Sequence, residues 1–204
     1  MYYLARLIKK LIPAALKRTV IPRTSKVGGG SRLIDVTFGK YTFCGYDCEM
    51  YDTKVGSFCS IANNVKIGLQ SHPLTWASSS PAFYAGKDSI PKDIAKLTFS
   101  PPTQQTQIGN DVWIGANCCI KRGIRIGNGA VIGMGSIVTH DVGPYEIWAG
   151  NPARLIRKRF DDETIQRFEE SKWWEREVSA LKKAALYAED ADRFLQEIIE
   201  TSPL

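Results

Sequence analysis

The chain has 204 residues, of which 44% are hydrophobic and 24% are charged, and its formal net charge is +6. This composition predicts one globular domain with an appendage and excludes a chain that is largely disordered. No stretch reaches the length of a membrane span, and no signal-peptide cleavage site follows a compact apolar run, so we expect a cytoplasmic protein.

The positive charge has two sources, the N-terminal segment and a cluster formed by Arg154, Arg157, Lys158 and Arg159. Basic clusters often bind nucleic acid, but this sequence has no zinc pattern, no recognition-helix motif and no groove of interleaved aromatic residues. We therefore expect an anionic small molecule as the partner of the cluster, and no nucleic acid.

Residues 1–30 form the first predicted unit. Residues 2–18 place apolar side chains on one side and basic side chains on the others, which predicts an amphipathic helix interrupted at Pro13. The helix either caps the structure that follows or holds residues 1–18 against the inner face of a membrane, and we favour the cap because the ends of a repeat fold need cover. The Gly/Ser-rich residues 24–33 are interpreted as a linker.

A six-residue period organises the next segment. Six steps along a helix turn a side chain to another face, whereas six steps along a strand return it to the same face. In residues 108–143 an aliphatic residue returns at every sixth position, at Ile108, Ile114, Ile120, Ile126, Ile132 and Val138. The residues four positions after each of these are small or aliphatic and are expected on the same inward face: Val112, Cys118, Ile124, Ala130, Ser136 and Val142.

Hexads of this kind are typical of a parallel β-helix, in which each coil buries its core only against the next coil. Weaker hexads precede them at Val55, Ile61 and Ile67, and at Phe38 and Cys44, with the register slipping by one residue between Cys44 and Val55. The alternative is a Gly-rich antiparallel β domain in which the hexads align by chance. We favour the β-helix and predict that it spans residues 31–156.

Five cysteines, Cys44, Cys48, Cys59, Cys118 and Cys119, mostly fall inside the repeats, where small apolar side chains are needed. Their number is odd and they include no C-x-x-C pair. We expect reduced core residues and no metal site.

Residues 69–107 interrupt the period between two runs that are in phase, and they are rich in Pro, Ser and aromatic residues. A loop of this length in a compact repeat fold is usually functional, because insertions project from one face. The loop carries His72, one of only two histidines in the chain.

Residues 157–204 form the last predicted unit, a helical extension. Asp161 or Asp162 is a candidate N-cap, the Trp173-Trp174 pair follows, and a second helix is expected near residues 184–199.

Three stretches together resemble the hexapeptide-repeat acetyltransferases of the left-handed β-helix superfamily: "IGNDVWIGANCCI", the loop opening "SHPLTWASSSPAFY", and "PYEIWAGNPARLIRKRF". More narrowly they resemble the xenobiotic-acetyltransferase branch, which includes sugar and polysaccharide O-acetyltransferases. The likeness runs from Phe38 to the tryptophan pair. With the elements above, it implies a mainly β fold: a left-handed parallel β-helix with an inserted active-site loop, an N-terminal amphipathic helix and C-terminal α-helices.

The resemblance also implies a chemistry. The loop histidine of the family is a general base, and His72 matches it, with Ser78 and Pro81 at the spacing of the family's loop. An imidazole can take the proton of an acceptor hydroxyl while the oxygen attacks the thioester of acetyl-CoA, so that no acyl-enzyme is needed. Which of Ser71 and Ser78–Ser80 orients the ring stays open.

Contacts with acetyl-CoA carry over from the family to seven positions: Trp113, Ala116, Met134, Thr139, His140, Arg154 and Arg157. Two features depart from the usual pattern, since Met134 stands where a small residue is frequent and Trp148-Ala149 where Val-Gly is frequent. The candidates for substrate binding lie in the loop: Trp76, Ser78, Phe83 and Tyr84.

The implied function is acetyl-CoA-dependent O-acetyl transfer to a sugar of a surface polysaccharide or its precursor. Three alternatives stay open: an antibiotic acetyltransferase of the chloramphenicol type, an amino-sugar N-acetyltransferase, and a catalytically silent β-helix scaffold. The resemblance also implies a homotrimer with its active sites at subunit interfaces. The loop has three aromatic residues that we expect to be exposed in a single chain: Trp76, Phe83 and Tyr84. Burial of these side chains against a partner subunit is more favourable than their exposure to water.

Overall fold

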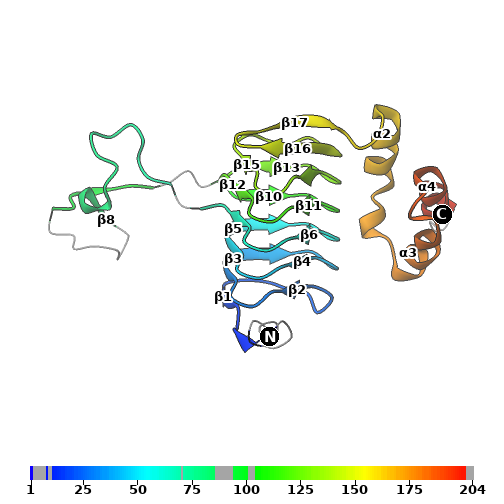
Figure 1. Cartoon of the computed structure of the whole chain (residues 1–204), viewed down its shortest axis with the longest axis horizontal. Helices are drawn as coiled ribbons and strands as arrows, with labels where there is room; N and C mark the ends of the chain where they lie inside the picture. Colours follow the sequence, from blue (N-terminus) through cyan, green and yellow to red (C-terminus); the bar gives the residue numbers. More distant parts are fainter. Residues whose placement is uncertain (2–7, 9–10, 70, 86–93, 101–103, 201–204) are drawn as a thin grey trace.

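The computed structural model describes residues 1, 8, 11–69, 71–85, 94–100 and 104–200. Figure 1 shows three parts: a central stack of short strands, an arm that projects from one side of the stack, and a group of helices on the opposite side. The first strands lie at one end of the stack and the last strands at the other, so the chain climbs the stack coil by coil (Figure 1).

Two sheets, built mainly from parallel strands, make up the stack. The eight-stranded sheet contains β1 (Ala15–Lys17), β3 (Arg32–Phe38), β5 (Glu49–Val55), β7 (Lys66–Ile67), β10 (Thr106–Ile108), β12 (Cys119–Ile120), β13 (Arg125–Ile126) and β15 (Ile137–Val138). The seven-stranded sheet contains β2 (Lys26–Val27), β4 (Phe43–Cys44), β6 (Ser60–Ile61), β11 (Trp113–Ile114), β14 (Val131–Ile132), β16 (Glu146–Gly150) and β17 (Ala153–Lys158). β17 runs antiparallel to β16 at the end of the stack.

The long strands turn a corner, so the larger sheet provides two faces and the stack has three. In β5, Glu49 and Met50 pair with β7, whereas Thr53–Val55 pair with β10. Between these two halves, Asp52 has a φ of 44°, a left-handed conformation that aspartate tolerates better than most residues. The prediction of a left-handed parallel β-helix is confirmed.

The length of a coil changes along the stack, and this change explains the slip in the sequence period. Phe38 pairs with Val55, seventeen positions later, whereas Ile108 pairs with Ile126, eighteen positions later. The missing residue falls inside β5, where the inward side chains of Met50 and Val55 are five positions apart instead of six.

The inward side chains of the hexads are buried, as predicted. Ile114, Ile132 and Val138 are each 0% exposed. The residues four positions after each hexad residue are buried with them: Val112, Cys118, Ile124, Ala130, Ser136 and Val142. Both inward positions of each hexad therefore contribute to one continuous core.

The cysteines are free thiols, and all but the partly buried Cys119 are buried. Cys59 and Cys118 donate from Sγ to the carbonyl oxygens of Gly109 and Gly133, each at 3.1 Å. Burial raises the pKa of the Cys59 thiol to about 12. Four of the five cysteines are thus core residues, as predicted, and Cys119 is the exception.

The stack begins earlier in the chain than predicted. Ala15–Lys17, expected within the amphipathic helix, forms β1 and pairs with β3, and the supposed linker contains β2 and the corner after it. At Gly28 a Cβ atom would lie 2.3 Å from the carbonyl oxygen of Gly45, so this glycine allows two corners to stack closely. Ile8 and Leu11 have helical backbone, and the rest of the predicted helix before Leu11 lies outside the described residues.

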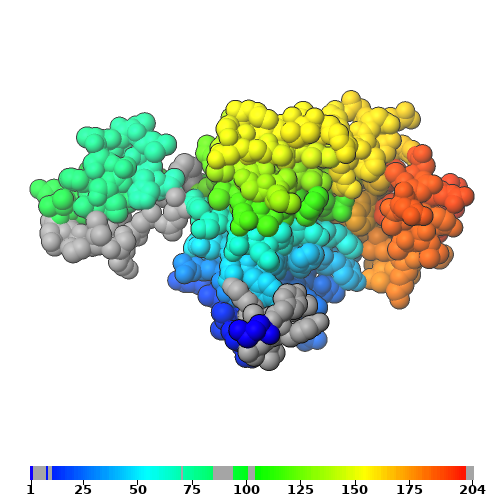
Figure 2. Space-filling view, viewed as in Figure 1, coloured from blue at the N-terminus to red at the C-terminus, as the bar shows by residue number. Residues whose placement is uncertain are grey.

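The arm is inserted at the corner between β7 and β10. Its described part contains the short helix η1 (Pro81–Phe83) and two parallel strands, β8 (Tyr84–Ala85) and β9 (Leu97–Thr98). Figure 2 shows it as a lobe beside the stack. The insertion predicted at residues 69–107 includes the first two residues of β10 (Thr106–Ile108), which belong to the stack.

The C-terminal part is helical: α2 (Asp162–Ser171), η2 (Trp173–Glu175), α3 (Val178–Ala184), η3 (Ala185–Tyr187) and α4 (Ala191–Glu200). Asp161 is the N-cap of α2, and its side chain accepts from the backbone N–H of Thr164 at 2.7 Å. The predicted second helix is divided between α3, η3 and α4. No helix in the described part of the chain is long and apolar enough to cross a membrane.

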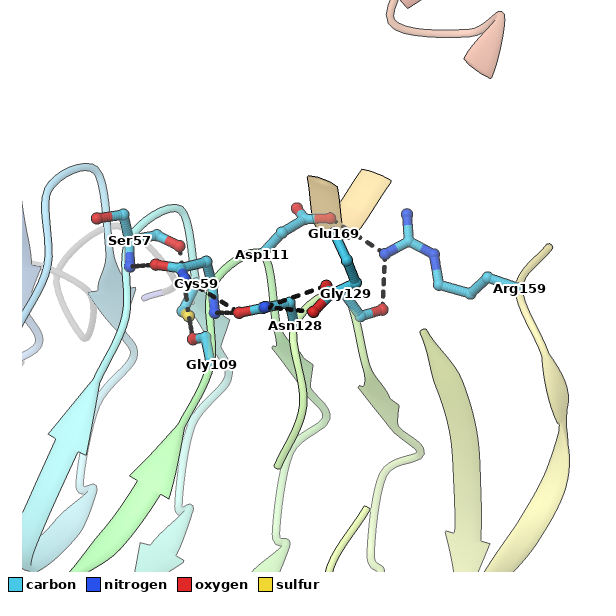
Figure 3. A network of polar contacts seen from close by, with 9 residues as sticks. Ser57, Cys59, Gly109, Asp111, Asn128, Gly129, Arg159 and Glu169 are labelled. Atoms are coloured by element: carbon cyan, nitrogen blue, oxygen red, sulfur yellow. Dashed lines mark hydrogen bonds and ion pairs between the residues drawn. The ribbon is translucent and has the colours of Figure 1, made fainter. Parts of the chain in front are cut away.

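A polar network attaches α2 to one corner of the stack (Figure 3). Glu169 accepts from Asn128 Nδ2 at 3.0 Å, and Asn128 Oδ1 accepts from the backbone N–H of Asn110 at 2.8 Å. Arg159 donates to Asp111 at 3.1 Å and to the carbonyl oxygen of Gly129 at 2.7 Å (Figure 3). Burial nevertheless raises the pKa of Asp111, and Arg159 opposes that rise.

Candidate active site

The base of the arm and one corner of the stack form a cleft of about 980 Å³. The arm contributes Leu69, residues 71–76, Phe99 and Gln104. The stack contributes Cys119–Ile124 and Ile137–Asp141, which are two successive coils at the same corner. A small molecule bound in this cleft would contact the coils of the stack on one side and the arm on the other.

His72 is held through one nitrogen of its ring. Nδ1 lies 3.0 Å from the carbonyl oxygen of Ser79 and 2.9 Å from the hydroxyl oxygen of Tyr84. A carbonyl oxygen can only accept, so Nδ1 carries the proton and the neutral ring keeps its lone pair on Nε2. His72 is an exposed lining residue of the cleft, so this arrangement suits a general base.

Among the four candidate serines, the group that contacts the ring is the backbone carbonyl of Ser79 and not a serine hydroxyl. The hydroxyl of Ser78 accepts from the N–H of Ser80, and the hydroxyl of Ser80 accepts from the N–H of Ala82 and caps η1. Ser71 Oγ is buried without a hydrogen-bond partner among the described residues. Sequence reasoning left the four serines unresolved because a backbone contact has no residue-type signature.

Three aromatic side chains support the base of the arm. The ring of Tyr84 lies 6.0 Å from that of Trp76 and 5.5 Å from that of Phe99, measured between centroids, and Tyr84 is 1% exposed. Phe83 is 45% exposed. Of the predicted loop aromatics, Tyr84 is thus buried within its own chain, contrary to the expectation that it would need a partner.

The stack side of the cleft contains two of the predicted cofactor residues and two basic residues that the sequence did not single out, Lys121 and Arg122. Thr139 Oγ1 lies 2.9 Å from His140 Nδ1. Arg122 donates to Asp52 Oδ2 at 2.5 Å, with both side chains mostly buried. The pair joins positions seventy residues apart, so spacing along the sequence gives no sign of it.

The other five predicted cofactor residues lie away from this cleft. Trp113 is 52% exposed on β11, and Met134 is 79% exposed at another corner, where the N–H of Gly135 donates to the carbonyl oxygen of Ala116 at 2.8 Å. Arg154 and Arg157 are exposed on β17. A single chain therefore brings together His72, Thr139 and His140, and leaves the remaining five outside.

A second groove, of about 490 Å³, lies between the stack and α2 and contains none of the predicted site residues. Within the described ranges, no group of three or more His, Cys, Asp or Glu side chains has an arrangement that could hold a metal ion. The cleft at the base of the arm is the one of these two hollows that contains predicted site residues.

The family model described as "Hexapeptide repeat of succinyl-transferase" matches residues 105–140. A chloramphenicol acetyltransferase of Agrobacterium fabrum is 40% identical over 169 residues, which cover 74% of this chain and 80% of that protein. The chloramphenicol acetyltransferase of Klebsiella aerogenes is 46% identical over 133 residues, or 64% of this chain, and the match spans 62% of that relative's length. The galactoside O-acetyltransferase of Escherichia coli is 34% identical over 122 residues, which cover 60% of this chain and 52% of that protein.

Among solved structures, a hexapeptide-repeat acetyltransferase from Vibrio cholerae in complex with acetyl coenzyme A is similar, with a TM-score of 0.51 and 22% identity, over 78% of each chain. An N-acyltransferase from Bacillus cereus has a TM-score of 0.53 and 18% identity, over 83% of this chain and 95% of that one. At these identities the two structures support the fold alone.

Proposed function

The chain belongs to the hexapeptide-repeat acetyltransferase family, and from this premise we propose that it transfers the acetyl group of acetyl-CoA to a hydroxyl group of an acceptor. The observation that carries the proposal is the contact between His72 Nδ1 and the Ser79 carbonyl oxygen, which leaves Nε2 free to accept a proton. A hydroxyl is a poor nucleophile near neutral pH, and a positioned imidazole supplies the base that it needs.

The proposed reaction has no covalent enzyme intermediate. His72 Nε2 takes the hydroxyl proton as the acceptor oxygen attacks the thioester carbonyl carbon. A backbone N–H at a coil corner stabilises the oxyanion of the tetrahedral intermediate. This intermediate then expels the CoA thiolate, which receives the proton from the imidazolium. The products are the acetyl ester and CoA.

Acetyl-CoA would approach along the stack side of the cleft. Lys121, Arg122 and His140 line that side and can attract phosphate groups, and Thr139 adds a hydroxyl. We propose that a neighbouring copy of the chain provides the remaining contacts for acetyl-CoA: Trp113, Ala116, Met134, Arg154 and Arg157.

Two classes of acceptor have specific support. The sequence favours a sugar of a surface polysaccharide or its precursor, in keeping with the similarity to the galactoside O-acetyltransferase. The higher identity to the chloramphenicol acetyltransferases favours chloramphenicol. Both offer hydroxyl groups, so one mechanism serves either. In each case Trp76, Ser78 and Phe83 are the proposed acceptor contacts in the arm.

The proposal includes a homotrimer. The arm projects from the stack (Figure 1) and exposes apolar side chains: Leu74 is 91% exposed, Leu97 57% and Ile94 53%. Exposed apolar side chains grouped on one projection are typical of a surface that a partner covers. In a cytoplasmic protein, residues 1–18 are proposed as a cap on the first coil, in keeping with the pairing of Ala15–Lys17 with β3, and a peripheral membrane contact is the alternative.

The decisive test is CoA release from acetyl-CoA in the presence of sugars, amino sugars and chloramphenicol. We expect His72→Ala to lower kcat about 10²- to 10⁴-fold, the usual contribution of a general base, with acetyl-CoA still bound. His140→Ala is the comparison and should raise the KM for acetyl-CoA while largely preserving kcat. Equal turnover by wild type and His72→Ala would contradict the mechanism, and absence of acetyl-CoA binding by wild type would favour a scaffold.

A further inference from the structure

Tyr84 combines deep burial with a polar contact to the proposed base. The side chain is 1% exposed between the rings of Trp76 and Phe99. Its backbone is fixed as well, because its N–H donates to the carbonyl oxygen of Pro81 and it pairs with Leu97 in the β8–β9 ladder. The hydroxyl oxygen therefore occupies a defined place, 2.9 Å from His72 Nδ1.

The chemistry of that nitrogen limits what the hydroxyl can do. Nδ1 already donates its single proton toward the Ser79 carbonyl oxygen at 3.0 Å, so it has no lone pair to offer to a second donor. The Tyr84 oxygen is then a second acceptor for the same N–H. Two acceptors for one N–H resist rotation of the ring more than one acceptor does.

We propose that Tyr84 is a positioning residue for the acetyl transfer, and this inference rests on the proposed function. Its oxygen holds the His72 ring so that Nε2 faces the cleft. It also stabilises the imidazolium that forms when Nε2 takes the acceptor proton, because hydrogen bonds strengthen when the donor becomes charged. The sequence predicted Tyr84 as a substrate contact. Because Tyr84 is buried, we infer instead that it acts on the reaction through His72.

The two roles separate in the kinetics. An interaction that strengthens only as the imidazolium forms changes kcat and leaves KM unchanged, whereas a substrate contact changes the KM for the acceptor. We expect Tyr84→Phe, which keeps the ring and its packing, to lower kcat about tenfold with KM unchanged, since the Ser79 carbonyl remains as an acceptor.

The same variant has a spectroscopic readout that needs no acceptor. In ¹⁵N-histidine-labelled protein two rings contribute signals, and His72→Gln assigns them by loss of one set. In Tyr84→Phe we expect the Nδ1–H proton of His72 to move upfield, while the ring stays protonated on Nδ1 because of the Ser79 carbonyl. Tyr41→Phe, which removes a hydroxyl from a ring stacked on Phe58 at a remote corner, is the matched control and should change neither measurement.

An unmoved Nδ1–H resonance in Tyr84→Phe would overturn the inference. So would a raised KM with kcat preserved, which would return Tyr84 to the substrate contacts. A wild-type protein that transfers no acetyl group would refute the proposed function instead, and the Nδ1–H resonance would still test the contact between the two side chains.

Discussion

The stack and the arm place their residues by different means. In the stack, Ile132 is 0% exposed and its strand, β14, has partners in the coil below and the coil beyond it, so its position follows from a repeated pattern. In the arm, Tyr84 owes its position to two rings, one short helix and a two-residue ladder. The repeat therefore supplies a rigid wall, whereas the proposed base contacts a small local cluster in the arm.

The first way to test this contrast is to remove apolar volume from each region. Ile132→Ala should lower the free energy of unfolding by about 2–5 kcal/mol, because it leaves a cavity between closely stacked coils. Leu74→Ala, at a side chain that is 91% exposed in a single chain, should change the free energy of unfolding of the dissociated monomer by less than about 0.5 kcal/mol. Urea denaturation followed by circular dichroism measures both. Similar losses in the two variants would contradict the division between the stack and the arm.

Thiol reactivity compares the buried core of the stack with the cleft between the stack and the arm. The pKa of Cys59, raised to about 12 by burial, predicts a reaction roughly a thousandfold slower than that of an ordinary thiol. Cys119, partly buried and a lining residue of the cleft, should react first with a thiol reagent, and acetyl-CoA should slow that reaction. The rapid phase should disappear in Cys119→Ser. A rapid phase that persists would place the accessible thiol elsewhere.

The smallest expected effect concerns the attachment of the helices. Glu169→Ala removes the acceptor for Asn128 Nδ2 and should destabilise the fold by about 1–3 kcal/mol, since a partly buried donor then lacks its partner. Glu170→Ala is the matched control, because Glu170 bonds only to Gln166 of the same helix in the described network. Its effect should stay within about 0.5 kcal/mol. Equal effects in the two variants would show that the network in Figure 3 contributes little.

The sequence was most informative where the same type of side chain recurs at a fixed spacing. The inward faces at Ile114 and Val138 could be predicted because period six has few explanations other than stacked coils. The corner at Gly28 has the composition of a linker, since a glycine needed for close stacking and a glycine in a flexible segment look alike in one sequence. The shortened coil at Met50 and Val55 was visible as a slip in the register, but its cause required the pairing of the strands.

The candidate site could be predicted only in part for a related reason. His72 stood out as a histidine in a long insertion, and its partners did not. The Ser79 carbonyl has no side-chain signal, and the pairing of Arg122 with Asp52 joins distant coils. Tyr84 was predicted at the site, but the sequence does not show whether an aromatic side chain in a loop is exposed or buried, and only the packing distinguishes the two.

The insertion point of the arm has a consequence for folding. β5 pairs directly with β10, and β7 with β12, so the ladder of backbone hydrogen bonds continues past the insertion. The chain must therefore close a long loop at this one corner before the upper coils can nucleate on the lower ones. The entropy of loop closure grows only with the logarithm of loop length, by about 0.6 kcal/mol for each doubling. A longer or shorter arm should thus change the free energy of assembling the stack only slightly.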